Sequence, residues 1–304
     1  MTPLPHIPRP DDGEADLEAL ATLDANGLFM APRESEKDYL KRLHQFAERM
    51  HDFNNKLETG DGYLLDDLKL RPKLSVTDEL MEVCANRTEE HYAFRAEWVP
   101  AFYINPKFSW LFGGCAYYSM PDMFTVVILR KSFRNRRKWL FYDRREILSH
   151  EMCHAARMAT GSRVFEERLA YRVSDSGFRK RFGGLLHSPF DTLAILGSTF
   201  LLLGVQMLKT FIAPGVPILP FWMLVIGVAA FMLGRDRHCH RALTRAIGNL
   251  ENVTEHPATV AFRCSDAEIE QISRFENAEE LRGWIQNACE HDRRWQVIAH
   301  RFIS

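Results

Sequence analysis

The chain carries near its middle the stretch His150-Glu151-Met152-Cys153-His154, which has the form H-E-x-x-H. Residues four apart lie one above the other on a helix, so the two imidazoles can converge on one ion. Glu151 then lies beside that ion. There it can take a proton from water, while zinc lowers the pKa of the water and polarises a carbonyl. The stretch therefore predicts a hydrolytic zinc centre with its own general base.

Uncharged residues flank and interleave this stretch. They are Ile147, Leu148, Met152, Cys153, Ala155 and Ala156. A helix of this composition is suited to burial in a core that carries a metal, and Cys153 lies off the ligand face, as a small core residue would. The alternative is a surface helix with two exposed histidines and one glutamate, which the apolar surroundings disfavour.

A catalytic zinc site needs a third protein ligand and leaves one position open for water. The zinc helix is expected to end near residues 159–161, with Gly161 as the left-handed residue after it and Ser162 as the cap of the next helix. That next helix carries Glu166 and Glu167, and either can be the third ligand. Both could instead be solvated on a surface helix.

With this second helix the sequence resembles the gluzincin metallopeptidases, including membrane-associated CaaX-processing-like and minimal gluzincin proteases. Their second helix supplies a Glu ligand, often in a Glu-x-x-Ala setting followed by Asp or Asn, and Glu167-Arg168-Leu169-Ala170 matches the first part. The resemblance implies Glu167 as the preferred ligand, with Glu166 as the alternative. Tyr171 stands where the family has Asp or Asn. That acid orients a ligand histidine, and Asp175 is a substitute for it.

The resemblance also implies an α+β fold, in which a zincin-like catalytic domain combines a small mixed sheet with the zinc helix pair. Three upstream segments have the aromatic and β-branched composition of strands, namely residues 98–104, 115–119 and 124–129. In gluzincins an edge strand binds substrate by strand addition. Residues 124–129 lie where that edge is expected, or they form an ordinary core strand.

A long apolar region follows the two glutamates. From Thr192 to Gly234 there are 43 residues and one charge, Lys209. A membrane-spanning helix needs about 20 apolar residues, so residues 190–208 and roughly 213–233 predict a transmembrane helical hairpin with a turn at the Pro and Gly residues between them. The alternative is a buried helical hairpin in a soluble core, but such helices normally carry charges on their outer face.

Basic residues flank this hairpin on both sides. Arg179-Lys180-Arg181 precede it and Arg235, Arg237 and Arg241 follow it, whereas its turn region holds one Lys. The positive-inside rule then predicts an integral membrane protein whose termini and active site are cytoplasmic. The expected partners are the lipid bilayer and a protein or peptide substrate, which is a membrane protein, a lipid-anchored protein or a soluble protein recruited to the membrane.

Composition narrows the remaining functions. The net charge of −1 over 304 residues provides no basic field for nucleic acid, and 46% hydrophobic residues suffice for one substantial core. Six scattered cysteines favour free thiols in a reducing compartment. Residues 1–16 are Pro-rich and acidic and lack the basic and apolar regions of a signal peptide, which also favours a cytoplasmic amino terminus.

These patterns divide the chain into four parts. Residues 1–33 are expected to be a disordered leader and residues 34–186 the zincin-like metallopeptidase domain, which begins with an amphipathic helix over about 34–58. Residues 187–236 form the transmembrane hairpin. Residues 237–304 form a helical cytoplasmic region that either packs against the catalytic domain or recruits a partner.

Zinc peptidases usually add a side-chain donor for the developing oxyanion. Tyr171 is the nearest candidate, one turn beyond Glu167 on the same helix face. His187, at the predicted membrane boundary, is a second candidate. The plain alternatives are a packing Tyr and an interfacial His.

Together these features predict a membrane-anchored zinc metallopeptidase in which His150, His154 and Glu167 hold Zn²⁺ and Glu151 is the general base and acid. The alternative from another class is a non-catalytic membrane adaptor or regulator that retains a structural or vestigial zinc site. A further alternative is zinc-dependent hydrolysis of a non-peptide amide. An intact Glu151 favours an enzyme, since a structural site has no use for a base.

Overall fold

The H-E-x-x-H stretch lies in helix α4 (Arg144–Arg157), whose first turn is fixed by Asp143. The Asp143 side chain accepts a hydrogen bond from the Arg145 backbone N–H at 2.9 Å, which satisfies a donor at the helix start. Leu148 and Met152 are fully buried. The apolar composition of this helix therefore places it in the core, as the sequence predicts.

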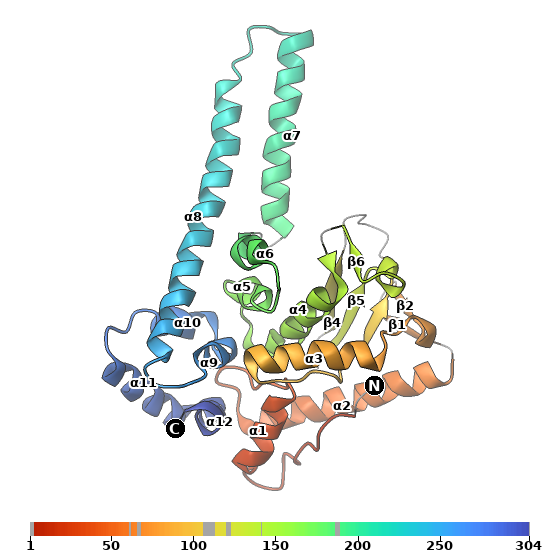
Figure 1. The fold of residues 1–304 in the computed structure, drawn as a ribbon, viewed down its shortest axis with the longest axis vertical. Coiled ribbons are helices and arrows are strands. Elements are labelled where there is room, and N and C mark those ends of the chain that lie inside the picture. The colour runs from red at the N-terminus through yellow and green to blue at the C-terminus, as the bar shows by residue number, and fades with distance from the viewer. Residues whose placement is uncertain are drawn as a thin grey trace.

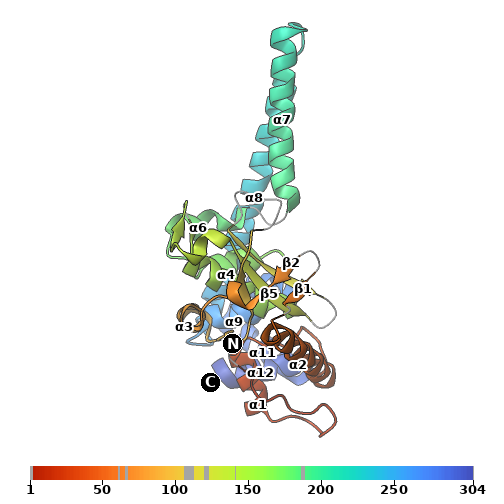
Figure 2. The ribbon, with the colours of Figure 1, turned by 90° about the vertical axis from the view of Figure 1, so that its right-hand side faces the viewer.

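The computed structural model has a folded body from which a long helical hairpin projects (Figure 1). The view turned by 90° shows the hairpin as a narrow stalk (Figure 2). The residues that the structure describes are 3–60, 62–65, 68–105, 113–119, 123–140, 142–185 and 189–303.

α4 packs against a three-stranded sheet of order β3-β5-β4. The strands are β3 (Ala101–Tyr103), β4 (Gly114–Ser119) and β5 (Phe124–Leu129). β3 runs parallel to β5, and β4 runs antiparallel to it. Each of the three predicted segments contains a strand, although the first is a strand only over residues 101–103, and the fold is a mostly helical α+β fold with small mixed sheets.

β5 is the central strand of this sheet. All six of its residues are buried, and its continuous apolar run is typical of a strand that is covered on both faces. The prediction that residues 124–129 form the substrate-binding edge is therefore wrong, and the alternative of a core strand holds. The edge strand beside α4 is β4.

Short elements complete this part of the body. They are the antiparallel pairs β1 (Tyr63–Leu65) with β2 (Leu68–Leu70) and β6 (Lys138–Trp139) with β7 (Tyr142–Asp143), and the 3-10 helices η1 (Pro72–Leu74) and η2 (Lys131–Arg134). Helix α3 (Asp78–Tyr92) packs against α4.

The amino-terminal part differs from the expected disordered leader. Residues Leu17–Ala25 form helix α1, because Leu20 and Leu23 are buried against the body and α1 packs on helix α12 (Arg293–Phe302). The predicted amphipathic helix is confirmed as α2 (Glu36–Glu58).

Helices α7 (Pro189–Phe211) and α8 (Leu219–Leu250) form the projecting hairpin. Both are long and apolar enough to cross a membrane, and only 22% and 11% of their apolar windows are buried inside the protein. The hairpin is therefore not the buried core element of the alternative. The predicted second span begins too early, because residues 213–218 form the turn and α8 starts at Leu219. The predicted hairpin start, residue 187, lies outside the described residues.

The carboxy-terminal region packs against the rest of the body. It contains the end of α8 and four further helices, namely α9 (Pro257–Arg263), α10 (Asp266–Ile272), α11 (Ala278–His291) and α12. α9 packs on α3, and the buried Arg263 pairs with Asp24 of α1 at 2.8 Å and donates to the Tyr92 carbonyl at 2.9 Å. The packing against the rest of the body that the sequence left open is therefore observed.

Candidate metal centre

Three side chains from two helices converge on one point of the body. His150 and His154 come from α4, and Glu167 comes from α5 (Glu166–Tyr171). The Nε2 atoms of the two histidines are 3.0 Å apart. Glu167 oxygens lie 3.4 Å from Nε2 of His150 and 3.5 Å from Nε2 of His154. All three ligand atoms lie within 4.8 Å of one another, so the group could hold a metal ion.

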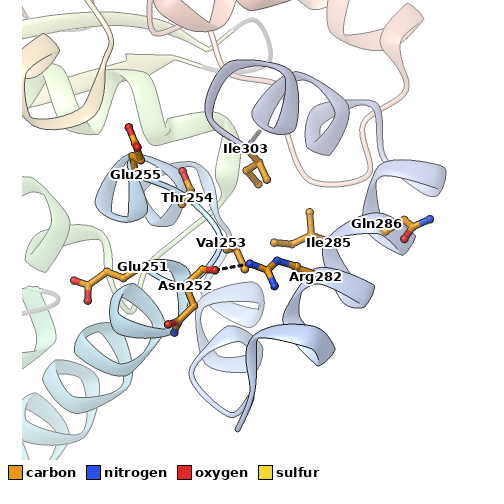
Figure 3. A pocket seen from close by; sticks show the side chains of 9 residues that line it. All are labelled: Glu251, Asn252, Val253, Thr254, Glu255, Arg282, Ile285, Gln286 and Ile303. Carbon is orange, nitrogen blue, oxygen red and sulfur yellow. Dashed lines mark hydrogen bonds between the residues drawn. The ribbon is translucent and has the colours of Figure 1, made fainter.

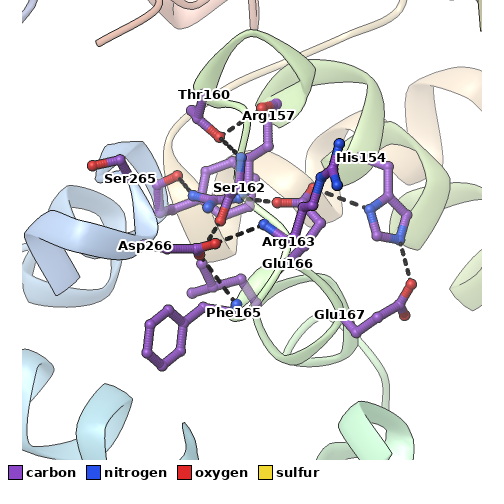
Figure 4. A network of polar contacts seen from close by, with 12 residues as sticks. His154, Arg157, Thr160, Ser162, Arg163, Phe165, Glu166, Glu167, Ser265 and Asp266 are labelled. Atoms are coloured by element: carbon purple, nitrogen blue, oxygen red, sulfur yellow. Dashed lines mark hydrogen bonds and ion pairs between the residues drawn. The ribbon is translucent and has the colours of Figure 1, made fainter. Parts of the chain in front are cut away.

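Glu166 lies on the other side of His154. Its Oε1 is 3.0 Å from Nδ1 of His154, the ring nitrogen that is turned away from His150 (Figure 4). Its Oε2 accepts a hydrogen bond from Nε of Arg157 at 2.7 Å. Of the two candidate third ligands, Glu167 therefore belongs to the metal group, and Glu166 orients one of the histidines.

The guanidinium of Arg157 is buried at the end of α4, with a side-chain exposure of 0%. Besides Glu166, it donates to the backbone carbonyls of Phe262 and, at 3.3 Å, of Cys264. The sequence reasoning missed this residue. The sequence did indicate a role for it. Arg157 lies one turn after His154 on a largely apolar helix, where an arginine needs buried partners.

The carboxylates around His154 change its proton affinity. Burial alone would lower the pKa of His154, but the hydrogen bond to Glu166 and the negative charge of Glu167 outweigh burial and raise the pKa to about 9. Burial would raise the pKa of Glu166, but Arg157 and His154 outweigh it and lower that pKa. An ion bound by His154 therefore has to displace a proton.

α5 begins without a capping side chain of its own. After α4 the chain makes the 3-10 turn η3 (Met158–Thr160), and Gly161 follows with a φ of 63°, as predicted for the left-handed residue after the zinc helix. The prediction that Ser162 caps the next helix is wrong, since Phe165 occupies the cap position. Asp266 of α10 instead accepts hydrogen bonds from the backbone N–H groups of the three residues before α5 (Figure 4).

Glu151 faces the edge strand of the sheet. It is buried, and its Oε2 accepts a hydrogen bond from the Ala116 backbone N–H of β4 at 2.7 Å. The ladder between β4 and β5 includes the bond from the Arg130 N–H to the Gly113 carbonyl at 2.9 Å. Because inward and outward residues alternate along an antiparallel strand, the Ala116 N–H points away from β5. Glu151 therefore lies at the outer edge of β4.

Gly114 allows β4 to lie directly against α4. A Cβ at this position would be 2.5 Å from Cγ2 of Ile147 and 3.0 Å from Cδ2 of Leu129. Real side-chain atoms do not approach so closely, so a larger residue would separate the strand from the helix. The glycine thereby brings the outer edge of β4 within reach of Glu151.

A cavity of about 110 Å³ opens beside the metal group, and His150, Glu151 and Tyr171 line it. The ring centroid of Tyr171 is 4.3 Å from that of His150. Burial, and then the charge of Glu167, raise the pKa of Tyr171 well above its usual range, so its phenol stays protonated and can donate a hydrogen bond. Tyr171 therefore lies where the sequence reasoning placed it, next to the metal group. The second candidate donor, His187, lies outside the described residues.

Asp175 contacts a different partner from the expected one. Its carboxylate pairs with Arg87 of α3 and is 74% exposed, while its backbone N–H donates to Glu146 at 2.7 Å. The prediction that Asp175 orients a ligand histidine is therefore wrong, and Glu166 makes that contact instead. Two adjacent glutamates on α5 thus take two different positions at the centre.

α5 also contacts the base of the hairpin. Arg168 pairs with Asp236 of α8, and both side chains are 3% exposed. Arg168 also donates to the Asp236 backbone carbonyl at 3.0 Å. On the same side, the ring of Tyr171 lies against Gly183 of the 3-10 helix η4 (Gly183–Leu185). α5 therefore lies between α4 and the hairpin (Figure 1).

A larger cavity, of about 510 Å³, lies between the end of α8, α11 and Ile303 (Figure 3). Its wall includes Glu251, Glu255 and Arg282, and Arg282 donates to the Asn252 carbonyl at 2.9 Å. None of its lining residues belongs to the metal group. The smaller cavity is therefore the one that adjoins the candidate chemistry.

The fold and the site together define a class of protein. It is a mostly helical α+β protein with a His-His-Glu group that could hold a metal ion and with two helices long enough to span a membrane. No protein-family model, no curated protein and no solved structure matches the chain.

Proposed function

We propose that this chain is a membrane-anchored, zinc-dependent metallopeptidase. The observation that carries the proposal is the arrangement around one small cavity. The ligand histidine His150, the carboxylate of Glu151 and the phenol of Tyr171 line the cavity, and Glu167 completes the metal group. A metal group with a neighbouring base, a neutral donor and space for substrate is what hydrolysis of an amide requires.

The dimensions of the group support zinc as the ion. Two ligand atoms that each lie about 2.1 Å from a tetrahedral zinc ion are about 3.4 Å apart. The two histidine Nε2 atoms are 3.0 Å apart, and they lie 3.4 and 3.5 Å from the two different oxygens of Glu167. Two imidazole nitrogens and one carboxylate oxygen are also a common donor set of catalytic zinc, with the fourth position left for water.

The side chains divide the proposed chemistry between them. Zinc, when bound, supplies a Lewis acid that lowers the pKa of water and polarises the scissile carbonyl. Glu151, oriented by the Ala116 N–H, takes the proton of the attacking water and delivers it to the leaving nitrogen. Tyr171 donates a hydrogen bond to the oxygen on which negative charge develops.

The proposed substrate is an extended peptide that adds to the outer edge of β4. Among the described residues, β4 pairs with β5 on one side only. The outward backbone groups of β4 other than the Ala116 N–H, which already donates to Glu151, are those that an added strand uses. Because Glu151 contacts this same N–H, a peptide on the edge of β4 would place its backbone beside the base.

The hairpin is proposed to cross the lipid bilayer. Phe190, Phe200 and Phe231 are 78%, 67% and 68% exposed, and soluble monomers rarely leave so much apolar surface open to water. The basic residues on both sides of the hairpin favour a cytoplasmic position for the termini and for the metal group. Membrane proteins and membrane-recruited proteins are then the natural substrates.

The substitution Glu151→Gln tests the proposal. We expect the detergent-purified wild type to hold about one zinc per chain by elemental analysis and to cleave an internally quenched peptide library. The variant should keep its zinc and lose hydrolysis by about 10²-fold or more, because the base is gone while the ligands remain. Glu146→Gln is a matched control on the same helix, since Glu146 also lines the cavity but pairs with Arg179.

Two results would count against the peptidase. One is hydrolysis that survives Glu151→Gln, and the other is a wild type without zinc. A wild type that binds zinc but cleaves no peptide would support the adaptor instead. Structural zinc sites usually have four protein ligands, whereas this group has three among the described residues.

A further inference from the structure

We propose that Asp266, at the start of α10, is a positioning residue of the metal centre that sets which glutamate of α5 reaches the ligand histidines. This inference rests on the metal centre proposed above. Asp266 lies far along the chain from the centre, in the carboxy-terminal region, and does not belong to the H-E-x-x-H stretch or to its downstream glutamates.

The carboxylate of Asp266 binds the whole loop between η3 and α5 (Figure 4). Its Oδ2 accepts hydrogen bonds from the N–H groups of Arg163 at 2.7 Å and Val164 at 2.9 Å. Its Oδ1 accepts from the N–H of Phe165 at 3.2 Å and from the hydroxyl of Ser162. The three consecutive backbone donors just before α5 therefore share one acceptor group.

α5 needs such an external partner. It has six residues, and a helix this short is not stable without tertiary contacts. Its cap position is occupied by Phe165, which has no side-chain acceptor for the first N–H groups. Asp266 accepts from the N–H of the cap residue Phe165 and from those of Arg163 and Val164, and so holds from α10 the chain that leads into α5.

The position at which α5 starts decides the role of its glutamates. Successive residues on a helix point about 100° apart. A start shifted by one residue would therefore turn Glu167 away from His150 and His154 and alter the contact of Glu166. By fixing the amides of residues 163–165, Asp266 fixes this start.

Asp266 is itself held rigidly. The preceding residue, Ser265, forms a reciprocal cap with Glu268 at the start of α10, and Glu268 accepts hydrogen bonds from Arg294 and, at 2.7 Å, from Trp295. The neighbouring carbonyls of Phe262 and Cys264 bind Arg157, which in turn binds Glu166. The segment from α9 to α10 thus reaches the metal centre by two separate routes.

The substitution Asp266→Asn tests this role with little change in side-chain size. An asparagine keeps one acceptor oxygen, but its NH2 group would face backbone N–H donors on the other side, so the loop before α5 would lose part of its anchoring. We expect the zinc affinity of the full-length protein in detergent, measured by competition with a chromophoric chelator, to fall by about 10–100-fold, as is typical when a residue that orients ligands is lost. The visible spectrum of the Co²⁺-substituted protein should change as well, because Glu167 is displaced.

Glu268→Gln is the matched control. It alters a buried carboxylate on the same helix whose Oε1 binds Arg294 and Trp295 rather than the loop before α5, while a glutamine oxygen can still accept from Ser265 and keep the cap next to Asp266. We expect it to lower the melting temperature but to leave the zinc affinity and the Co²⁺ spectrum of the folded protein unchanged. A general loosening of the carboxy-terminal region would instead affect both variants alike.

The outcomes separate this inference from the proposed function. If the wild type binds no zinc, both the proposed function and the role of Asp266 are wrong. Alternatively, the wild type binds zinc, while the folded Asp266→Asn protein binds it equally well and has the same Co²⁺ spectrum. In that case only the proposed role of Asp266 is wrong. If Asp266→Asn does not fold, Ser162→Ala decides, since it removes one bond to Asp266. A weaker zinc affinity supports the role, and an unchanged affinity overturns it.

Discussion

The two helices that supply the metal ligands are held in place in different ways. α4 has 14 residues and is fixed by apolar side chains that pack on the sheet and on α3. α5 has six residues, and its start and its polar face are fixed by Asp266, Arg157 and Asp236, all of which lie outside it. The first helix is held by apolar packing, whereas the second is held by charged side chains, of which Asp236 and Asp266 are distant in the sequence.

This difference has a consequence for mutations. A change in the contacts of α5 should loosen the third ligand while the core around α4 stays folded. A change in the packing of α4 should lower the stability of the whole body, because α4 lies inside the common hydrophobic core. Mutations at α5 are therefore expected to change mainly the metal affinity, and mutations at α4 mainly the stability of the protein.

Arg157→Met should have the largest effect, because it breaks the link between the two helices. It leaves Glu166 and two backbone carbonyls without their buried partner. Removal of one member of a buried ion pair costs about 3–5 kcal/mol of unfolding free energy. We expect a loss of this size in denaturant unfolding, together with weaker zinc binding in a chelator competition.

Arg263→Met is the control for this change. Arg263 is an equally buried arginine of α9 that pairs with Asp24 and donates to the carbonyls of Tyr92 and Thr259. It should reduce stability to a similar extent but leave the zinc affinity of the folded protein unchanged. Equal losses of zinc affinity in the two variants would contradict a specific role for Arg157.

Asp236→Asn should have the second-largest effect, because it weakens the contact between α5 and the hairpin. Arg168 would lose the charge of its partner, and a buried donor left poorly satisfied costs about 1–3 kcal/mol. In hydrogen exchange followed by mass spectrometry, the amides of α5 should exchange faster while those of α4 stay protected. Asp191→Asn, which alters the partly exposed pair with Arg235, should leave both helices unchanged. Faster exchange in α4 as well would show that the two helices are not held separately.

Gly114→Ala should have a smaller effect, and on α4 rather than α5. The added Cβ would meet Ile147 and Leu129, and we expect a loss of about 1–2 kcal/mol, the lower part of the range for overpacking, because an edge strand can shift. Thermal unfolding measures this loss. Gly113→Ala is the control, since its Cβ would approach only the flexible end of Ile147, at 3.0 Å. An equal loss in both variants would argue against the close approach at Gly114.

The smallest effect should be a dependence of stability on acid pH, caused by Asp266 at the start of α5. Burial would raise the pKa of Asp266, but its hydrogen bonds from residues 162–165 outweigh burial and lower the pKa below 3.8. A lowered pKa in the folded state means that Asp266 stabilises the protein above pH 3.8 and that this contribution is lost as the pH falls through the lowered value. The difference in stability between wild type and Asp266→Asn should therefore be constant from neutral pH down to about pH 3.8 and shrink as the pH falls further. A difference that stays constant below that pH would contradict the lowered pKa.

The part of the site on α4 could be predicted from sequence because its geometry is local. The spacing of His150 and His154 places both on one helix face, and the apolar residues between them indicate burial. The apolar character of the hairpin is local in the same sense, since length and composition alone make its helices long enough to span a membrane. Features set by the residues of a single helix were therefore predicted well.

The part of the site on α5 could not be decided in this way. Glu166 and Glu167 are adjacent, and the contacts around them are long-range ones: Arg157 binds Glu166, and Asp266 binds the loop before α5. No sequence pattern links residues 163–165 with Asp266. The substrate edge was misplaced for a related reason, since strand order is a long-range property, although the unbroken apolar run of β5 was a sign of a central strand.

Helix α8 continues without a break from Leu219 to Leu250. Asp236, which binds the helix that carries Glu167, follows the last apolar turn of the hairpin directly. With the hairpin in a bilayer, the metal group lies close to the lipid headgroups. An extended chain advances about 3.3 Å per residue, so a bond only a few residues from a substrate's own membrane anchor would reach the centre. If the chain is the proposed peptidase, the hairpin would favour cleavage at a set distance from the bilayer, and shared anchoring would raise the local concentration of substrate.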